Sequence, residues 1–467
     1  MKRKHAAVKT GGISRRAFVM AGAASTLTAA SWARVAGAND RVGVGFIGYG
    51  LIGKRHVLDF QEQKDVDLIG VAETHRGRRD EAVAQMAGAA QGHDDFRKLL
   101  DDKNVQAVVV STPDHWHALQ TMLACAAGKD VYVEKPLTLF VREGRWMIDV
   151  ARRGKSVIQV GTQQRSGPHY QRARELLQQG QLGKITSVRM GSFRNIMPGF
   201  GRPADSDSPA ELDWEMWQGP APARQYNPQR VLYHFRWFWD YSGGQMTNLA
   251  AHGLDVTHWF LDASGPSAVT SVGGRSNLQD LGETPDTQDT LFEYPGFTVL
   301  WSHREACAGQ GKPAHEFCGP KGILAISRAG FALTGDRKIA PQNAVPQFAG
   351  PHPAGGPKAQ AAEPGAPTQL WTESVEDKSG DVTGQFKLHV RNFLDCVKNR
   401  NEPNSPLEGG HRVATACHLA NISLRLGRRI RWDAAQEKIL DDPEASAMLE
   451  RPYRAPWDRE LKALLKG

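Results

Sequence analysis

The sequence predicts an α/β protein of two domains, the first of which contains a parallel sheet. Its length of 467 residues suits two domains better than one. Between residues 42 and 160, short apolar runs rich in β-branched residues alternate with segments of helical periodicity. Such alternation indicates parallel strands joined by right-handed helical crossovers. Later, the segments 289–306 and 315–327 alternate around Pro-Gly and Gly-Pro turns, which indicates further strands.

Residues 1–38 have the layout of an export signal and precede the predicted domains. Arg15 and Arg16 in "SRRAF" resemble the twin-arginine motif, an apolar segment spans 17–33, and "AGA" at 36–38 is a small-residue exit. The apolar segment contains too many polar residues for a membrane anchor. We therefore expect export to the periplasm or beyond through the twin-arginine machinery. An ordinary secretory leader and an uncleaved disordered arm are the alternatives.

The positive charge of the chain is concentrated in this leader. The formal net charge is +8, and seven basic residues precede Asp40, the first acidic residue. Removing residues 1–38 lowers the net charge to +1, which argues against nucleic-acid binding. No later stretch is apolar enough to span a membrane. The five cysteines contain no C-x-x-C pair and are expected to be buried thiols, with a Cys307–Cys318 bridge as the alternative.

A dinucleotide-binding motif opens the first domain. The segment Gly48–Gly53 reads G-x-G-x-x-G directly after a strand-like run, where glycines allow a tight turn and close approach to a pyrophosphate. The helix that begins there would point free N–H groups at the phosphates. Glu73, twenty residues later, ends a second strand, where a carboxylate can hold ribose hydroxyls. This pattern favours NAD, while Arg76, Arg78 and Arg79 leave NADP open.

Two further segments follow strand-like runs, and ligand sites of parallel sheets lie beyond the carboxyl ends of strands. They are "STPDHWH" (111–117) and "EKP" (134–136). The two histidines of the first segment could meet on one side of an extended chain, but no third metal ligand stands nearby, so no metal is expected. The expected cofactor contacts are Gly48, Gly50, Leu51, Ile52, Gly53, Glu73, Thr112, Pro113, His115, Glu134 and Lys135.

Together, GYGLIG, STPDHWH, EKP and a later GG…H-x-x-D segment resemble the glucose–fructose oxidoreductase / inositol dehydrogenase / MocA family over residues 41–432. The resemblance implies an N-terminal Rossmann domain and a C-terminal α/β domain with a large open, mainly antiparallel sheet. It also implies NAD(P)-dependent chemistry on a sugar or cyclitol, and a dimer or tetramer formed through that sheet. The family's lysine corresponds to Lys135, whose ammonium can polarise a substrate hydroxyl.

The domain limits follow from these segments. The first domain is expected at 39–160 and the second, for substrate and oligomerisation, at 161–432. The stretch 341–367 is rich in Pro, Gly and Ala and is expected to be a mobile loop. Two helices late in the chain are expected to return to the first domain, and the tail at 433–467 is expected to lie on the surface.

A helix predicted after two glycines, with Thr247 or Asn248 as its cap, carries candidate catalytic groups. Asn248, His252 and Asp255 are spaced by four and three residues and so share one face of an α-helix. The resemblance implies an aspartate and a histidine here, and His252 matches the histidine, a suitable general base. Asn248 replaces the aspartate. Because an amide carries no charge, Asn248 can hold a hydroxyl but is doubtful as a proton acceptor.

An aromatic-rich segment before this helix suits a sugar ring, since aromatic faces and a few convergent polar groups are typical of such sites. Plain core packing is the alternative. The expected catalytic residues are Lys135, His252 and Asn248, and the expected substrate contacts are His117, Tyr233, His234, Arg236, Tyr241 and Asp255.

These features predict an exported NAD(P)-dependent oxidoreductase that acts on a sugar or cyclitol hydroxyl by hydride transfer. A redox-neutral, NAD-dependent glycosidase or lyase of the same family is one alternative, and a non-catalytic sugar-binding relative is another. Because the twin-arginine route carries folded proteins, it favours a cofactor that is loaded before export, held tightly and recycled in place.

Overall fold

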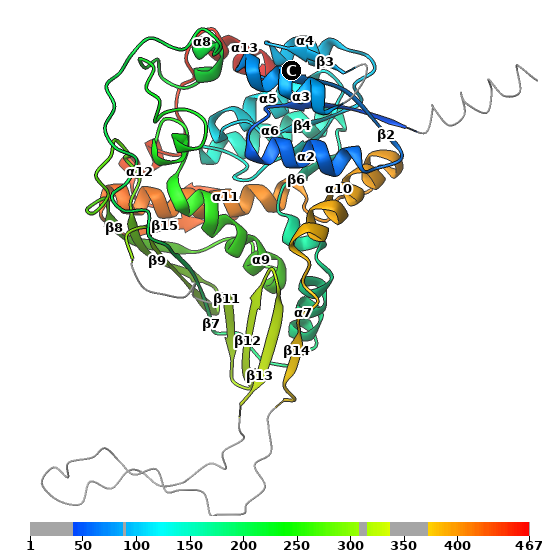
Figure 1. The fold of residues 1–467 in the computed structure, drawn as a ribbon. Coiled ribbons are helices and arrows are strands. Elements are labelled where there is room, and N and C mark those ends of the chain that lie inside the picture. Colours follow the sequence, from blue (N-terminus) through cyan, green and yellow to red (C-terminus); the bar gives the residue numbers. More distant parts are fainter. Residues whose placement is uncertain (1–40, 87–89, 308–314, 337–371, 467) are drawn as a thin grey trace, which may run out of the picture.

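The computed structural model describes residues 41–86, 90–307, 315–336 and 372–466. Within these ranges the chain forms two sheets with helices packed against them, the first sheet above the second in the view of Figure 1. The expected leader and the expected loop at 341–367 lie outside the described residues. The predicted α/β class, with a Rossmann domain followed by a second α/β domain, is confirmed.

The first sheet has six parallel strands in the order β3-β2-β1-β4-β5-β6. Its strands are β1 (Val42–Ile47), β2 (Val66–Ala72), β3 (Gln91–His93), β4 (Ala107–Val110), β5 (Asp130–Val133) and β6 (Ile158–Val160). The connecting helices are α2 (Leu51–Gln61), α3 (Arg76–Gln85), α4 (Phe96–Asp101), α5 (Asp114–Ala126) and α6 (Val141–Gly154). Because helices pack on both faces, β1 and β4 are buried along their whole length.

The second sheet has ten strands in the order β14-β13-β12-β11-β7-β10-β9-β8-β15-β16. Only the β7–β10 pair is parallel among its described pairs, so the sheet is mainly antiparallel, as predicted. The strands are β7 (Ser187–Phe193), β8 (Ala268–Gly274), β9 (Thr287–Tyr294), β10 (Phe297–Arg304), β11 (His315–Gly319), β12 (Gly322–Ser327), β13 (Gly330–Gly335), β14 (Val375–Asp377), β15 (Ile430–Asp433) and β16 (Lys438–Ile439).

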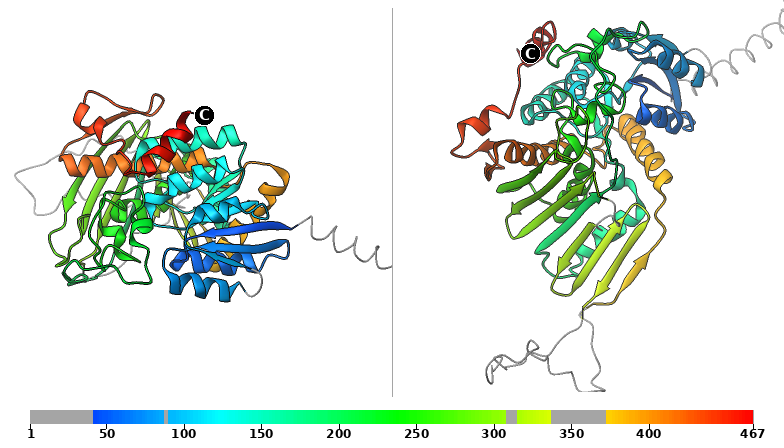
Figure 2. Two further views of the ribbon diagram at one scale, coloured as in Figure 1. Left: turned by 90° about the horizontal axis from the view of Figure 1, so that it is seen from above. Right: turned by 60° about the vertical axis from the view of Figure 1, so that its left-hand side comes forward.

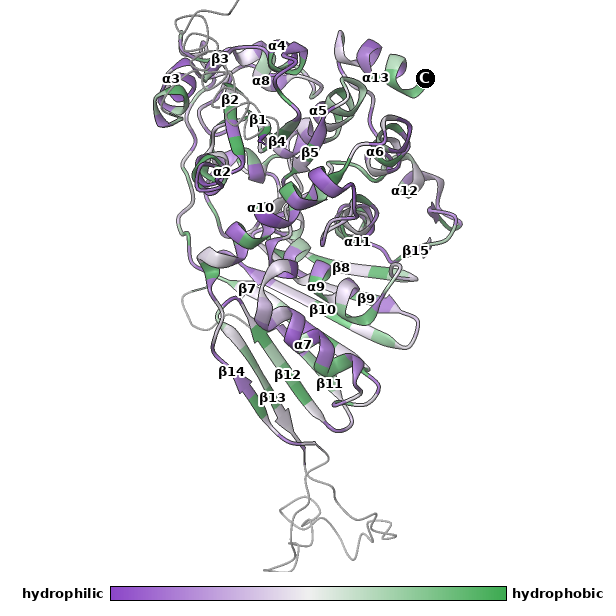
Figure 3. Cartoon of the chain, turned by 90° about the vertical axis from the view of Figure 1, so that its right-hand side faces the viewer, coloured by the Kyte–Doolittle hydropathy of each residue, from purple (hydrophilic) through white to green (hydrophobic). Residues whose placement is uncertain are grey.

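Helices cover one face of this sheet and form its core. The longer ones are α7 (Pro168–Gln178), α9 (Ala251–Leu261) and α11 (Leu407–Leu426), whose apolar residues pack on the strands. Figure 3 shows the hydrophilic colour of the outward side of α7. The shorter helical segments are η1 (Gln163–Ser166), α8 (Trp214–Gln218), η2 (His234–Trp237), η3 (Met246–Ala250) and α12 (Pro443–Ala447).

The end of the chain returns to the first domain. Helix α10 (Val382–Asn399) packs Phe393 against Phe60 and Tyr132, with ring centroids 6.3 and 5.8 Å apart. Helix α13 (Trp457–Lys466) packs Trp457 against Phe96 of the same domain, and Figure 2 shows this red helix beside the first domain. The expected return of α10 is therefore observed. The tail, expected to lie on the surface, also buries Tyr453, Trp457 and Leu461 in a hydrophobic core of the first domain.

Neither a membrane-crossing helix nor a disulfide occurs in the part of the chain that the structure describes. No described helix combines the length and the apolar character that crossing a membrane requires. The alternative of a Cys307–Cys318 bridge is not realised in this structure.

Candidate active site

A cleft of about 350 Å³ lies beyond the carboxyl ends of β1, β2, β4 and β5. This is the position that the parallel sheet predicts, because the helices after these strands begin here and leave space between them. The predicted site residues that line it are Gly48, Gly50, Leu51, Ile52, Glu73, Thr112, Pro113, His117, Glu134, Lys135, Tyr233 and Arg236.

The three glycines of the motif have three different functions. Gly48 has a φ of +91°, which favours glycine, at the turn after β1. Gly50 is the N-cap of α2, and a Cβ added there would meet no atom within 4 Å, so it would project into the cleft. A Cβ on Gly53 would lie 2.4 Å from the carbonyl oxygen of Gly48. Gly53 therefore allows α2 to pack against the turn and does not itself line the cleft.

Glu73 is held at the end of β2 with its carboxylate facing the cleft. Its Oε2 accepts a hydrogen bond from the backbone N–H of Tyr49 at 2.8 Å, and its Oε1 accepts one from His75 N–H at 3.0 Å. Oε1 also accepts from Thr74 Oγ1 at 3.3 Å, whereas Oε2 keeps a second lone pair. Glu73 can therefore accept hydrogen bonds from ribose hydroxyls without losing its backbone partners.

Gly50→Asp tests whether this turn holds a phosphate. The backbone there is extended and at an N-cap, so aspartate fits without strain and the stability of the ligand-free protein should not fall. The carboxylate would face the cofactor phosphates, and we expect NAD affinity to fall by roughly 100-fold from like-charge repulsion. Calorimetric titration measures the affinity. Leu58→Asp, which adds the same charge to an exposed position of α2, should bind NAD normally; equal affinities of the two variants would contradict the assignment.

Lys135 follows β5 and is held by the second domain. Its Nζ donates hydrogen bonds to the carbonyl oxygen and to Oδ1 of Asn248, both at 2.9 Å. Burial, opposed by the charge of Glu134 and reinforced by Arg236 and Arg328, lowers the pKa of Lys135 to about 8. The ammonium is thus protonated at neutral pH, and its position is set by Asn248.

Glu134 fixes the backbone of the neighbouring Lys135 through a hydrogen bond. One oxygen accepts hydrogen bonds from His56 Nε2 and Gln163 Nε2, each at 2.8 Å, and the other accepts from the backbone N–H of Lys135 at 3.0 Å. Burial alone would raise the pKa of Glu134, but the His56 hydrogen bond and the charges of His56 and Lys135 lower it. Because its oxygens already have protein partners, Glu134 orients the lysine segment although it lines the cleft.

Asn248 lies in a π-helical turn, η3, that precedes α9. The predicted α-helical start with Thr247 or Asn248 as N-cap is wrong, because Thr247 Oγ1 instead accepts from Gly243 N–H and donates to the Gly244 carbonyl. Such turns interrupt the regular α-helical spacing and are frequent at functional sites. Here Asn248 is turned toward Lys135.

The orientation of the Asn248 amide is fixed by a chain of hydrogen bonds. Asn248 Nδ2 donates to Gln245 Oε1 at 3.0 Å, and Gln245 Nε2 donates to Glu305 Oε1 at 3.0 Å. Since a carboxylate only accepts, the NH2 group of Gln245 must face Glu305, and its oxygen must face Asn248. Asn248 Oδ1 is thereby left for Lys135. An aspartate at 248 would instead oppose the oxygen of Gln245.

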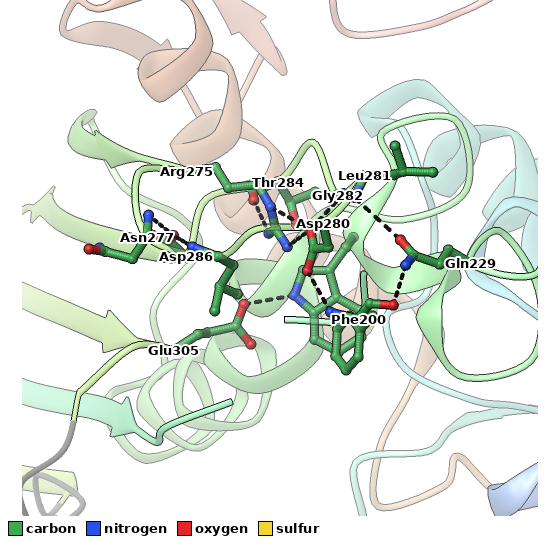
Figure 4. Close-up of polar contacts among 12 residues, drawn as sticks. Phe200, Gln229, Arg275, Asn277, Asp280, Leu281, Gly282, Thr284, Asp286 and Glu305 are labelled. Carbon is green, nitrogen blue, oxygen red and sulfur yellow. Dashed lines mark hydrogen bonds and ion pairs between the residues drawn. The ribbon is translucent and has the colours of Figure 1, made fainter. Parts of the chain in front are cut away.

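Glu305 and a neighbouring loop around Asp280, both labelled in Figure 4, hold the turn that carries Arg236. Trp237 Nε1 donates to Glu305 Oε2 at 2.7 Å, and the backbone N–H groups of Glu283 and Thr284 donate to the Trp237 carbonyl at 2.7 and 3.1 Å. Asp280 ties the loop by accepting from Arg275 and from Gly282 N–H. The turn η2 is therefore anchored from two sides, which places Tyr233 and Arg236 at the cleft.

His252 is one turn beyond Asn248 and contacts a residue that the sequence did not single out. Nη2 of Arg328, from the turn between β12 and β13, lies 3.3 Å from His252 Nε2. A guanidinium only donates, so Nε2 carries the lone pair and Nδ1 the hydrogen. Burial, together with the charges of Lys135 and Arg328, lowers the pKa of His252 well below its usual value. His252 is therefore a neutral hydrogen-bond acceptor at neutral pH.

Two predicted contacts, His115 and Tyr241, lie in a buried aromatic cluster behind the cleft. The segment "STPDHWH" is not extended, because α5 begins at Asp114, and His115 and His117 therefore point to opposite faces of a helix. His115 Nε2 contacts the Trp217 carbonyl at 3.0 Å, and burial lowers its pKa to about 3. Tyr241 packs on both rings. Neither His115, predicted to contact the cofactor, nor Tyr241, predicted to contact the substrate, lines the cleft.

Asp255 and His234 also lie away from the cleft. Asp255 is fully buried and accepts three hydrogen bonds of 2.8–3.0 Å from the guanidinium of Arg165. Asp255 therefore faces η1, the segment that carries Arg165. His234 stacks on Phe200, with ring centroids 4.1 Å apart. Both residues therefore support the structure.

His117 lines the cleft, but its ring is engaged by the backbone. Nδ1 lies 2.7 Å from the Pro136 carbonyl and Nε2 lies 2.8 Å from the Thr112 carbonyl. The ring thus ties the "STPDHWH" and "EKP" segments together. Among the described residues, no group of three or more His, Cys, Asp or Glu side chains could hold a metal ion.

Comparison with known proteins agrees with this architecture. Residues 42–162 match the family described as "Oxidoreductase family, NAD-binding Rossmann fold", and residues 174–281 and 378–459 match its C-terminal alpha/beta domain. Among solved structures, levoglucosan dehydrogenase in complex with NADH and levoglucosan has a TM-score of 0.61 at 17% identity, covering 84% of this chain and 99% of that one. The scyllo-inositol dehydrogenase from Lactobacillus casei has a TM-score of 0.58 at 18% identity, covering 85% and 99%.

Curated relatives are similar over shorter stretches. The inositol 2-dehydrogenase/D-chiro-inositol 3-dehydrogenase of Lactiplantibacillus plantarum is 30% identical over 157 residues, which are 33% of this chain and 45% of that protein. A glycosyl hydrolase family 109 protein of a Shewanella species is 31% identical over 185 residues, 38% of this chain and 37% of that protein. The chain thus matches less than half of the length of these relatives. With both domains matched, the chain belongs to the Gfo/Idh/MocA family of oxidoreductases, whose first domain is an NAD-binding Rossmann fold.

Proposed function

We propose that the protein is an NAD(P)-dependent oxidoreductase that converts a hydroxyl of a sugar or cyclitol to a carbonyl group and holds its cofactor tightly. The observation that carries this proposal is the arrangement at the end of the cleft. A protonated Lys135 lines the cleft there and is held by Asn248; Asn248 and the neutral His252, one helical turn further on, lie just outside the cleft lining. The inositol and levoglucosan dehydrogenases among the similar proteins support a polyol substrate.

The residues of the first domain fit NAD. The open space at Gly50 and the start of α2 suit the pyrophosphate, and Glu73 suits the ribose hydroxyls. When bound, the cofactor supplies the hydride acceptor. Arg78 also lines this end of the cleft and could pair with the 2′-phosphate of NADP, so NADP stays an alternative.

Lys135 and His252 have different roles at the substrate hydroxyl, one as hydrogen-bond donor and the other as proton acceptor. The Lys135 ammonium donates a hydrogen bond to the hydroxyl oxygen and stabilises the negative charge that develops there. His252 Nε2 accepts the hydroxyl proton, for which the substrate replaces Arg328 as its hydrogen-bond partner. As the C–H hydride leaves, the carbon–oxygen bond becomes a carbonyl, and the Asn248 amide keeps Lys135 in place throughout.

Two measurements test this proposal. Mass spectrometry after mild release should find nicotinamide dinucleotide in the purified protein. Incubation with a panel of sugars and cyclitols should then produce reduced nicotinamide, followed by absorbance. A protein that neither carries nor binds a nicotinamide would overturn the proposal.

A redox-neutral glycosidase is the second candidate, and the similarity to a glycosyl hydrolase family 109 protein favours it. That activity would cleave p-nitrophenyl glycosides with no net formation of NADH. Net NADH formation from a free sugar would instead support the oxidoreductase. A purely sugar-binding protein is disfavoured because Lys135 and His252 are both in place.

We further propose export through the twin-arginine machinery to the periplasm. Arg15 and Arg16, followed by the apolar segment and "AGA", support this route. Replacing both arginines by lysine should retain the protein in the cytoplasm, as measured by cell fractionation. Unchanged export of that variant would overturn this route.

The uncovered face of the second sheet supports a homo-oligomer. Leu291 and Leu300 are paired across β9 and β10, and both are more than 40% exposed. Exposed apolar patches of this kind are typical of interfaces. We expect Leu300→Lys to reduce the molar mass found by light scattering to that of one chain. Leu465→Lys, at an exposed position of α13, should leave the oligomer intact; a wild-type protein that is already monomeric would contradict the proposal.

A further inference from the structure

Three cationic side chains lie near the reacting end of the site, two of them in the lining of the cleft and the third, Arg328, outside it. Lys135 and Arg236 line the same cleft, and Arg328 contacts His252, one turn from the asparagine that binds Lys135. They come from three separate elements: the end of β5, the turn η2, and the turn between β12 and β13. Such a concentration of positive charge favours a ligand that brings negative charge.

Neither arginine has an ionic partner among the described residues. Arg236 donates to the Tyr233 carbonyl at 3.1 Å and stacks over the rings of Tyr233 and Phe235, at 4.7 and 4.6 Å from their centroids. Arg328 contacts only the neutral imidazole of His252 through its side chain. By contrast, the guanidinium of Arg165 is paired with a carboxylate, because it donates three hydrogen bonds to Asp255. A half-buried guanidinium without a carboxylate keeps its capacity to bind one.

The carboxylates near Lys135 are already engaged by protein groups. Glu134 accepts from His56, Gln163 and a backbone N–H, and Asp114 accepts a hydrogen bond from Ser242. At position 248, where the family resemblance implies an aspartate, the amide contributes no charge. The three cations thus face only two carboxylates, Glu134 and Asp114, which leaves an excess of positive charge on the substrate side.

We propose that the substrate is an acidic sugar or cyclitol, whose carboxylate or phosphate is bound by the guanidinium of Arg328 with Arg236 as the second cation. This inference rests on the proposed function and specifies its substrate class. It also explains the contact between Arg328 and His252. When the oxyanion draws Arg328 to itself, His252 Nε2 loses that donor and its lone pair becomes available for the substrate hydroxyl. A neutral sugar leaves Arg328 on the histidine.

The test compares acidic and neutral sugars on the purified holoenzyme. We expect kcat/KM for glucuronate or glucose 6-phosphate to exceed that for glucose by at least roughly 100-fold, as a charged hydrogen-bonded pair provides. Arg328→Gln should reduce this preference at least about tenfold and should lower kcat as well as raise KM for the acidic sugar. Arg189→Gln, which removes an equal charge from the exposed side of β7, should leave the preference unchanged.

A binding measurement keeps the test independent of turnover. With NADH present, glucuronate or glucose 6-phosphate should raise the midpoint of thermal unfolding of the wild-type protein more than glucose does, and added salt should weaken the effect. A response to one acid only identifies a carboxylate or a phosphate, and either supports the proposal. Equal responses to acidic and neutral sugars, or a preference unchanged in Arg328→Gln, would overturn it. Those results would overturn only the acidic substrate class and not the proposed oxidoreductase activity. Absence of nicotinamide binding would instead overturn the proposed oxidoreductase activity itself.

Discussion

Lys135→Ala is expected to lower turnover by roughly three orders of magnitude while NAD stays bound. The ammonium is the donor that stabilises negative charge on the substrate oxygen, and one such donor in a water-poor site changes rates by about 10² to 10³-fold. The cofactor is held mainly by the glycine turn and Glu73, so its binding should persist. Steady-state kinetics at saturating NAD and mass spectrometry of bound nicotinamide measure the two effects separately.

The control for this variant is Lys462→Ala, which removes an exposed lysine of α13 and should leave kinetics unchanged. Near-normal turnover of Lys135→Ala would show that another group performs the role. The pH profile adds a second check. Since the pKa of Lys135 is about 8 and its protonated form is active, kcat/KM should fall as pH rises through 8. His252, with its lowered pKa, stays neutral and should cause no loss between pH 7 and about 6.

Asp255→Ala is expected to destabilise the folded protein by about 3–5 kcal/mol, because it leaves the Arg165 guanidinium buried without its partner. The two side chains are 0% and 8% exposed, and three hydrogen bonds join them. The pair connects α9 of the second domain to η1, just after the last strand of the first sheet. Denaturant unfolding of the purified variant and of the wild type measures the change.

Two further variants separate charge burial from a role in catalysis. Glu175→Ala removes an exposed i,i+3 partner of Arg172 and should change stability by no more than about 0.5 kcal/mol. Replacing both members, as Arg165→Met with Asp255→Leu, should recover part of the lost stability because no unpaired charge remains. If Asp255→Ala were as stable as the wild type but had a raised KM, the assignment to substrate binding would be restored.

Local sequence patterns predicted the cofactor half of the site well. Gly48, Gly50 and Glu73 line the cleft where the strand–turn–helix pattern places them, because short-range geometry alone decides where a parallel strand ends. Lys135 follows the same rule at the end of β5. His252 was found through the family resemblance, and its neutral state follows from burial and two neighbouring cations that spacing does not reveal.

Sequence patterns do not show which side of an element faces the cleft. His115 and Tyr241 belong to an aromatic-rich stretch, and composition cannot distinguish a ring that lines a cleft from one behind it. Asp255 lies in the regular helix α9 together with His252, but its carboxylate is bound by Arg165, which lies ninety residues away along the chain. Gln245, Glu305 and Arg328 carried no motif, so no sequence signal pointed to them.

The sequence by itself determined the two-domain α/β plan, the NAD-binding turn and the identity of the lysine, because each depends on neighbours within a few residues. Only the tertiary structure decided how the amide of Asn248 is turned and which cations face the substrate. Those outcomes depend on contacts such as Gln245 with Glu305 and Arg328 with His252, which join residues 60 and 76 positions apart. Packing of the second domain brings these groups together, and their charges set the chemistry of the site.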